Sequence, residues 1–582
     1  MSARELITEH LDLWTGAVTK KSSSGRGSNG KVELTGVKKL RELILELAVH
    51  GKLVEQYPAD TPADQLLERI AGRRNELISW KKIKNSKPLP PVTPDEAPSE
   101  LPVGWVWTRL GSIAEINPRN LGEDTLEASF IPMPLVTTSY HGEHGDEPRK
   151  WGDIKKGYSH FANGDVGLAK ITPCFENSKA AVFRHLRNGI GAGTTELHVA
   201  RPLSPAINPY FLLLFLKSPR FLTEGEKVMT GSAGQKRVPK GYFSETPLPL
   251  PPEEEQHRIV QKVDELMALC DRLEQQTSDQ LEAHETLVDT LLGTLTQSEN
   301  ATELADNWAR LATHFDTLFT TEQSIDKLKQ TILQLAVMGR LVEQDAGDEP
   351  GSALVARMLE TRDHLATNEG MKTKAGNEVP SNEMYLSLPN SWAWVRLGNM
   401  AKFIDYRGKT PTKTGSGKRL ITAKNIRQGY IDLEPEEFIS EEDYTKWMTR
   451  GFPRKGDLLF TPEAPLGNAA IVDLNEEFAL AQRAICFQWH HLDTSRFMLI
   501  QIMASPFQTK LVENATGMTA TGIKASKLKE IPVAIPPLKE QHRIVQKVDE
   551  LTALCDQLKE RLSQASETRN QLAEAVVQGA LN

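Results

Sequence analysis

An internal repeat constrains this chain more than any other feature of its sequence. The segment EQHRIVQKVDELMALCDRLEQQ at 255–276 recurs at 540–561, an offset of 285, with 17 of 22 positions identical. Residues 40–56 recur at 328–344 and residues 101–111 recur at 388–398, at offsets of 288 and 287. Three matched pairs in one order indicate two tandem halves, so the fold must build one frame twice.

The segments between the repeated motifs have diverged. Residues 112–246 and 399–531 share little beyond a Gly-Asp and a Ser-Pro pair, and they mix short β-rich runs with helical stretches. Each therefore predicts a compact α/β globule. At 582 residues the chain is also too long for one hydrophobic core.

We expect an α+β protein in which two α/β globules are separated by a long antiparallel two-helix coiled coil, with an additional N-terminal helical region. The predicted divisions are an N-terminal helical region with a proline-rich linker (1–100), the first globule (101–252), a central helical repeat with a long helix at 253–296, a second helical segment at 303–345 and a linker (253–387), the second globule (388–537) and a C-terminal helix (538–582).

Both long helices show the same start and the same apolar seam. A Pro-Pro pair and acidic residues precede positions that step by four and three, which is the 3.5-residue repeat of a coiled coil. The seam residues are Ile259, Val263, Leu266, Cys270 and Leu273 in the first copy and Ile544, Val548, Leu551, Cys555 and Leu558 in the second. Because such a stripe needs a partner, we expect the two helices to pair with each other, continuing through Leu287 and Leu572. Antiparallel pairing would relate the globules by a pseudo-two-fold axis, as in a DNA duplex.

Composition narrows the class of protein. The net charge is −8, yet residues 101–250 carry 17 basic against 14 acidic residues and residues 388–537 carry 19 against 16, so the acidity lies in the helical frame. The four cysteines form no Cys-x-x-Cys pair, which argues against disulfides and a zinc site. The longest apolar run, 210–216, is too short to span a bilayer, and we expect a cytoplasmic protein.

The repeated PPEEEQHRI at 251–259 and PPLKEQHRI at 536–544, together with LAVHGKLVEQ and LAVMGRLVEQ and two diverged globules, resemble the specificity subunit of type I restriction-modification enzymes, in particular its longer members. The resemblance covers essentially the whole chain. It implies a non-catalytic subunit whose globules are target recognition domains, each reading one half of an asymmetric bipartite sequence in double-stranded DNA. The helices would set the spacer and dock two adenine methyltransferase subunits, and two restriction subunits would complete the complex.

The resemblance also implies that this chain binds no cofactor, and that S-adenosylmethionine, ATP and Mg²⁺ belong to the partner subunits. The sequence agrees, since it contains no Asn/Asp-Pro-Pro-aromatic tetrapeptide and no Walker, HExxH or GxSxG motif. Two alternatives stay open. One is a coiled-coil protein scaffold without DNA specificity, and the other is a self-sufficient enzyme with an unrecognised site.

Candidate DNA contacts are basic, amide and hydroxyl side chains in glycine-rich loops, because these groups pair with base edges and phosphates. In the first globule they are Lys170, Arg184, Thr194, Thr195, Gln235, Lys236, Arg237 and Lys240, with the weaker stretch 136–141. In the second they are Arg407, Lys409, Lys424, Asn425, Arg427, Thr519, Thr521 and Lys524. The competing interpretation is an ordinary basic turn at 231–242 and a solvated flexible loop at 413–419, and threonines on strands can be mere β-formers. The repeated Trp105, Trp107, Trp392 and Trp394 are expected to anchor globule to helix rather than to stack on bases.

Overall fold

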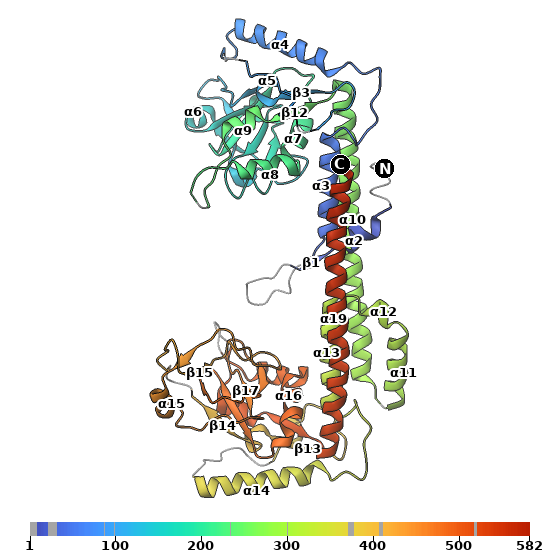
Figure 1. Cartoon of the computed structure of the whole chain (residues 1–582), viewed down its shortest axis with the longest axis vertical. Helices are drawn as coiled ribbons and strands as arrows, with labels where there is room; N and C mark the ends of the chain where they lie inside the picture. The colour runs from blue at the N-terminus through green and yellow to red at the C-terminus, as the bar shows by residue number, and fades with distance from the viewer. Residues whose placement is uncertain are drawn as a thin grey trace. The chain divides into compact units, whose positions relative to one another are not determined.

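The computed structural model describes residues 9–20, 32–85, 88–97, 99–232, 234–299, 301–369, 378–406, 411–516 and 521–581. The chain divides into two compact units, Met1–Leu281 with Ala565–Asn582, and Glu282–Gln564. Both units combine helices with sheets (Figure 1), which confirms the predicted α+β class.

Unit 1 contains the first globule and its helices. Its strands form two four-stranded sheets, in the orders β6-β5-β10-β7 and β4-β11-β8-β9, and the two-stranded β1-β2 and β12-β3. Only the β5–β10 pair is parallel among these described strands. The strands are β1 Thr19–Lys20, β2 Val32–Glu33, β3 Val106–Arg109, β4 Ala114–Ile116, β5 Glu127–Ile131, β6 Glu147–Lys150, β7 Ser159–Ala162, β8 Val166–Ala169, β9 Ala180–Val182, β10 Ile190–Gly193, β11 Leu197–Pro202 and β12 Pro247–Leu250. The short helices are α2 Leu11–Gly16, α3 Thr35–Val49, α4 Ala63–Ser79, α5 Leu110–Ile113, α6 Trp151–Ile154, α7 Pro209–Lys217, α8 Pro219–Lys227 and α9 Lys240–Glu245.

Unit 2 repeats this plan with one smaller sheet. The order β14-β20-β17-β18 matches β4-β11-β8-β9, a three-stranded sheet has the order β16-β15-β19, and β13 pairs with β21. The strands are β13 Ala393–Arg396, β14 Ala401–Asp405, β15 Lys418–Ile421, β16 Phe438–Ile439, β17 Leu458–Phe460, β18 Ala469–Ile471, β19 Phe478–Leu480, β20 Ile485–Trp489 and β21 Pro532–Ile535. The short helices are α11 Ala301–Thr313, α12 Phe315–Leu318, α13 Glu322–Val337, α14 Gly351–Glu369, α15 Glu441–Trp447, α16 Ser495–Met503, α17 Ser505–Glu513 and α18 Ala525–Glu530.

Each globule is closed by pairing its first strand with its last. In unit 1, β3 and β12 are antiparallel with Trp107 opposite Pro249, and in unit 2, β13 and β21 place Trp394 opposite Ala534. The entry and exit of each globule therefore lie side by side, directly before the long helix. This pairing explains why the Trp-x-Trp and Pro-Pro motifs occur together in both halves.

A hydrogen-bonded joint fixes each globule to its long helix. Trp105 Nε1 donates to Glu255 Oε2 at 3.0 Å, and Gln56 Nε2 donates to Glu255 Oε1 at 3.1 Å. Unit 2 repeats both bonds on Glu540, from Trp392 at 3.0 Å and from Gln344 at 2.6 Å. Burial raises the pKa of both Glu255 and Glu540, while the amide and indole donors oppose that rise.

The next residue of the motif completes the joint. Gln256 Nε2 donates to the Pro251 carbonyl at 3.1 Å, and Gln541 Nε2 donates to the Pro536 carbonyl at 3.0 Å. These bonds tie the first turn of each helix to the Pro-Pro exit. The joint thus explains the Glu-Gln pair of the repeated motif. The expectation that the tryptophans anchor globule to helix is confirmed for Trp105 and Trp392, whereas Trp107 donates to the Ser99 carbonyl and Trp394 contacts Tyr385.

The two long helices are α10, Glu253–Gln297, and α19, Leu538–Leu581. In unit 1 the core holds Ile259 near the start of α10 and Ala573 near the end of α19, whereas in unit 2 the core holds Leu292 near the end of α10 and Ile544 near the start of α19. The helices therefore run in opposite directions, as predicted. Of the ten predicted seam residues, eight are buried, and Leu551 and Leu558 are partly buried.

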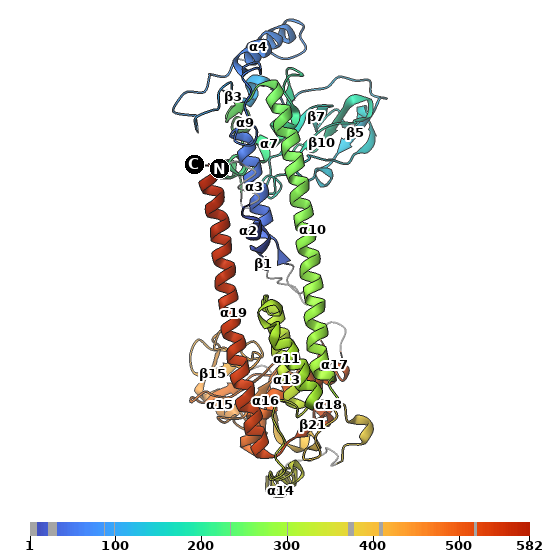
Figure 2. The same cartoon turned by 90° about the vertical axis from the view of Figure 1, so that its right-hand side faces the viewer.

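Each seam also packs against a shorter helix that the sequence prediction did not place there. Figure 2 shows α3 beside the first part of α10, and α13 beside the first part of α19. The same ion pair links each set, because Arg41 bonds to Asp271 at 2.6 Å and Lys329 bonds to Asp556. The seam is therefore covered by the repeated short helix as well as by the end of the other long helix.

The predicted continuation of the seam is wrong at two positions. Leu287 and Leu572 are 49% and 52% exposed, and their neighbours Val288 and Ala573 are buried instead. A straight α-helix has 3.6 residues per turn, so its buried face drifts by about 20° per heptad from a strict 3.5-residue repeat. The buried stripe consequently moves over by one residue after two to three heptads.

Candidate nucleic-acid interface

One edge of the first globule gathers most of its predicted DNA contacts. Ile171, just beyond β8, bridges to Arg237 in the loop before α9, and Arg237 also bridges to Thr230. Lys170 N donates to Glu196 O at 2.9 Å, which ties the end of β8 to the turn between β10 and β11. The edge thus brings together Lys170, Thr194, Thr195, Gln235, Lys236, Arg237 and Lys240.

Arg237 organises this edge rather than projecting from it. Its Nε and Nη2 each donate to the Glu196 carboxylate at 2.9 Å, and its Nη1 donates to the Gln235 carbonyl at 3.1 Å. The guanidinium lowers the pKa of the Glu196 carboxyl group, so the carboxylate stays charged and the pair stays closed. A base-reading role for Arg237 would require breaking this bidentate pair.

The side chains that remain available surround that pair. Gln235, Lys236 and Lys240 are exposed, as is Thr195, while Lys170 and Thr194 are partly exposed. Burial lowers the pKa of His198 in β11, and the positive charges of Lys170 and Lys240 lower it further, so both ammonium groups lie within electrostatic range of this histidine. With Glu196 neutralised by Arg237, the edge carries a net positive charge.

Arg184 does not join this edge. Its guanidinium lies 5.5 Å from the ring centroid of Tyr210 in α7, and its backbone N–H donates to the His144 ring at 3.2 Å. The prediction grouped it with the other candidates because sequence position alone does not show on which face a residue after β9 lies.

The second globule builds the corresponding edge. Thr516 and Glu463 each bridge to Gly522, as Thr230 and Ile171 bridge to Arg237. Thr521 and Lys524 lie there and are exposed, whereas Thr519 lies outside the described residues. The ion pair at this edge is Arg483 Nε with Glu463 Oε1 at 3.1 Å, and the Arg483 side chain is 57% exposed.

Arg483 is a candidate that the sequence prediction missed. It lies between β19 and β20, where the first globule has Thr194 to Glu196. Matching the two globules by their Gly-Asp pairs and final β-runs would have drawn attention to the turn between β19 and β20.

The remaining predicted contacts of the second globule lie in a turn after β15. Lys424 and Arg427 are exposed, and the Arg427 guanidinium contacts Asp432 Oδ2 at 3.2 Å. Asn425 is 1% exposed. Its side chain donates to the carbonyls of Asp432 and Pro435 and accepts from Thr422, so it holds the turn and has no amide donor left for a base. Arg407 and Lys409 lie outside the described residues.

Two further findings concern the described residues. Nowhere among them do three or more His, Cys, Asp or Glu side chains gather in a way that could hold a metal ion. In the same part of the chain, no helix has both the length and the apolar character needed to cross a membrane. Cys270 and Cys555 are buried, as expected for seam positions.

Comparison with known proteins identifies the family to which the chain belongs. Residues 102–283 and 389–567 match the family described as "Type I restriction modification DNA specificity domain". The EcoAI specificity subunit of Escherichia coli is 47% identical and the EcoEI specificity subunit of Escherichia coli is 45% identical, and each alignment covers 100% of both chains. Among solved structures, the HsdS subunit from Thermoanaerobacter tengcongensis is 19% identical, with coverage of 84% of this chain and 98% of that chain and a TM-score of 0.44. The chain belongs to the family of type I restriction-modification specificity subunits.

Proposed function

We propose that this chain is the DNA sequence-recognition subunit of a type I restriction-modification complex, and that each globule reads one half of an asymmetric bipartite target. One observation carries this proposal. Both globules have an exposed edge at the same place in the fold, with an Arg–Glu ion pair at its centre, but the side chains around that pair differ between the two globules. A mixed Lys, Gln and Thr edge around an Arg–Glu pair suits phosphate and base-edge contacts. The names of the two full-length relatives support it, and they argue against a scaffold without DNA specificity.

In this proposal the chain does no chemistry. Two methyltransferase subunits dock on the helical repeats, and restriction subunits join them to carry out ATP-dependent cleavage in the cytoplasm. S-adenosylmethionine, ATP and Mg²⁺ bind to those partners. The helical frame suits docking because its charge is acidic while the globules are mildly basic.

The division of labour between the globules can be tested by exchange. Replacing residues 101–252 with those of a relative should change one half of the methylated sequence, and adding residues to the long helices should change only the spacer. Methylated adenines mapped in a host that carries the complete system provide the measurement. A change in both halves after one exchange would contradict the two-reader arrangement.

Side-chain contacts at the first edge can be tested by salt dependence. The double variant Lys236→Ala, Lys240→Ala in the assembled complex should lower the slope of log affinity against log salt by about 2, because each phosphate contact contributes about 0.9. Lys82→Ala is the matched control, since Lys82 is an exposed lysine that stacks on Trp80 after α4. Equal slopes for the double variant and the control would remove these lysines from the interface.

A further inference from the structure

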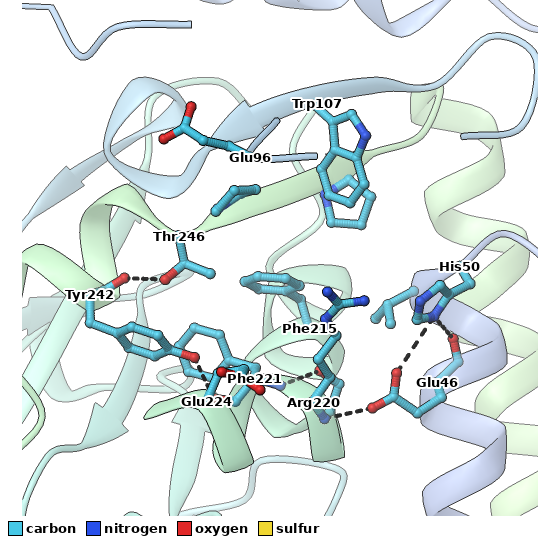
Figure 3. Close-up of a pocket in the computed structure, with 14 residues that line it drawn as sticks. Glu46, His50, Glu96, Trp107, Phe215, Arg220, Phe221, Glu224, Tyr242 and Thr246 are labelled. Carbon is cyan, nitrogen blue, oxygen red and sulfur yellow. Dashed lines mark hydrogen bonds and ion pairs between the residues drawn. The ribbon is translucent and has the colours of Figure 1, made fainter. Parts of the chain in front are cut away.

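Unit 1 contains a cavity of about 220 Å³ that the DNA-binding proposal does not use. It lies between α3, α8 and the β3–β12 pair (Figure 3), and its walls include Trp107, Phe215, Phe221, Tyr242 and Pro247. Of its fourteen lining residues, four are aromatic and two are proline, and the charged ones include Glu46, Glu96 and Glu224. A cavity that combines aromatic walls with polar groups at fixed positions is the usual form of a ligand site.

Unit 2 shows what fills the corresponding space in the other copy. The Tyr385 ring lies edge-on to Trp394, with 5.1 Å between the ring centroids, and its hydroxyl donates to the Pro532 carbonyl at 3.0 Å. Lys510 Nζ lies 5.7 Å from the centroid of the same ring. One tyrosine side chain therefore meets an indole, a backbone carbonyl and a cation.

All three of these neighbours have counterparts that line the cavity of unit 1. Trp107 corresponds to Trp394, Pro247 to Pro532 and Glu224 to Lys510, at offsets of 287, 285 and 286. The first two matches are fixed by strand pairing, because β3–β12 and β13–β21 have the same register. The third follows from the helices, because Glu224 is the sixth residue of α8 and Lys510 is the sixth residue of α17.

The residue that fills the space in unit 2 is missing from the sequence of the first repeat. Glu96 and Glu383 make the same ion pair, with Arg109 and Arg396. Tyr385 comes two residues after Glu383, whereas the residue two positions after Glu96 is a proline. The first repeat therefore keeps the walls of a tyrosine site and supplies no tyrosine.

The cation at this site comes from a different position in unit 1. Figure 3 shows the Arg220 guanidinium directed into the cavity. Burial raises the pKa of the Glu46 carboxyl group and the Arg220 charge opposes that rise, so the guanidinium lies within electrostatic range of Glu46. The backbone N–H of Arg220 donates to Glu46 Oε1 at 2.6 Å, and Glu46 is only 4% exposed. A buried carboxylate on α3 thus holds the start of α8 in place. Arg220 lies one helical turn before Glu224, so a cation again faces the space where Lys510 lies in unit 2.

We propose that the unit 1 cavity binds an aromatic side chain, that of tyrosine, presented by an extended segment of a partner polypeptide. The ring packs against Trp107 with Arg220 over its face, and its hydroxyl donates to the Pro247 carbonyl. A cation over an aromatic ring and an edge-on indole are both favourable contacts. This site is separate from the edge proposed to contact DNA, and it does not depend on that proposal.

The test uses the full-length chain and N-acetyl-L-tyrosinamide as the probe, with N-acetyl-L-leucinamide as the control. Saturation-transfer NMR should show saturable binding of the tyrosine probe at one site and weaker binding of the leucine probe. Arg220→Ala should weaken tyrosine binding several-fold, and Glu224→Lys, which introduces the cation found in unit 2, should strengthen it. Melting temperatures of the variants show that each is folded.

The second copy provides a gain-of-site control. Tyr385→Ala empties the corresponding space in unit 2, so that chain should bind two equivalents of the tyrosine probe. The proposal is overturned if the unaltered chain binds no tyrosine probe, if both probes bind equally, or if Arg220→Ala has no effect. Failure of Tyr385→Ala to add a second site would overturn the correspondence between the two copies on which the proposal rests.

Discussion

Lys217 is a buried lysine whose titration should be measurable in the stability of unit 1. It lies at the end of α7 and is 4% exposed, and its Nζ donates to the carbonyls of Ser178 at 2.6 Å and Thr138 at 3.3 Å. Among the described residues no carboxylate forms an ion pair with it. Burial lowers the pKa of Lys217 to about 7. The corresponding residue of the second repeat is Met503.

The sign and size of the effect follow from the pKa values of the folded and unfolded chains. A lysine exposed to water has a pKa of 10.5, so between pH 7 and 10.5 the unfolded chain binds a proton that the folded chain does not. The free energy of unfolding should therefore rise with pH across this window. With about 1.4 kcal/mol per pKa unit, the burial costs about 4 kcal/mol at pH 7 and about 2 kcal/mol at pH 9.

The assay compares the unaltered chain with Lys217→Met, which substitutes the residue of the second repeat. Urea unfolding of unit 1 at pH 7 and pH 9 should show the unaltered chain gaining about 2 kcal/mol relative to the variant. The variant also leaves two carbonyls without a donor, but that cost is independent of pH and cancels in the comparison. Equal pH dependence of the two proteins would refute the argument.

Two further predictions concern residues with defined structural roles. Trp105→Phe and Trp392→Phe should each lower the free energy of unfolding of their own unit by about 1–3 kcal/mol, because each leaves a buried glutamate without its indole donor. Denaturant unfolding followed by hydrogen exchange shows which unit is destabilised. Destabilisation confined to the other unit would contradict the role of these tryptophans in the joint. Asn425→Ala should cost about 2–3 kcal/mol in the same assay while Lys424→Ala should stay within about 0.5 kcal/mol; similar losses for both would mean that the Asn425 side chain does not hold the turn.

The repeated frame could be predicted from the sequence because its signals are local. Helix starts are marked by proline and acidic residues, and the seam is marked by its spacing, so α10 begins at Glu253 as expected. The sequence pattern does not show which helix packs against the apolar seam. An apolar stripe shows that something covers it, and both α3 and the end of α19 satisfy that requirement.

The candidate site was predictable in part. The Gly-rich loop at 231–242 pointed to an exposed edge, and the described part of that loop lies there. What could not be predicted was how the side chains pair. Arg237 and Asn425 have side chains that could bind DNA bases. The Arg237 guanidinium is paired with Glu196, however, and the Asn425 amide is hydrogen-bonded to Thr422, Asp432 and Pro435. Pairing depends on residues 41 positions away and on strand register, and neither is visible in a motif.

Comparing the two halves distinguishes the structural features that both copies share from those found in one copy alone. The joint on Glu255 and Glu540, the entry and exit strands and the ion pair from the short helix are the same in both copies, so they belong to the frame. Lys217 has no counterpart lysine in the second copy, so the frame does not require it. A buried ammonium lowers stability, yet it holds the carbonyls of the 136–141 loop and of the turn before β9. The stability lost by burying the Lys217 ammonium group is therefore linked to the position of the 136–141 loop. This loop belongs to the diverged part of the globule. The two copies should differ there if each reads its own half of a target.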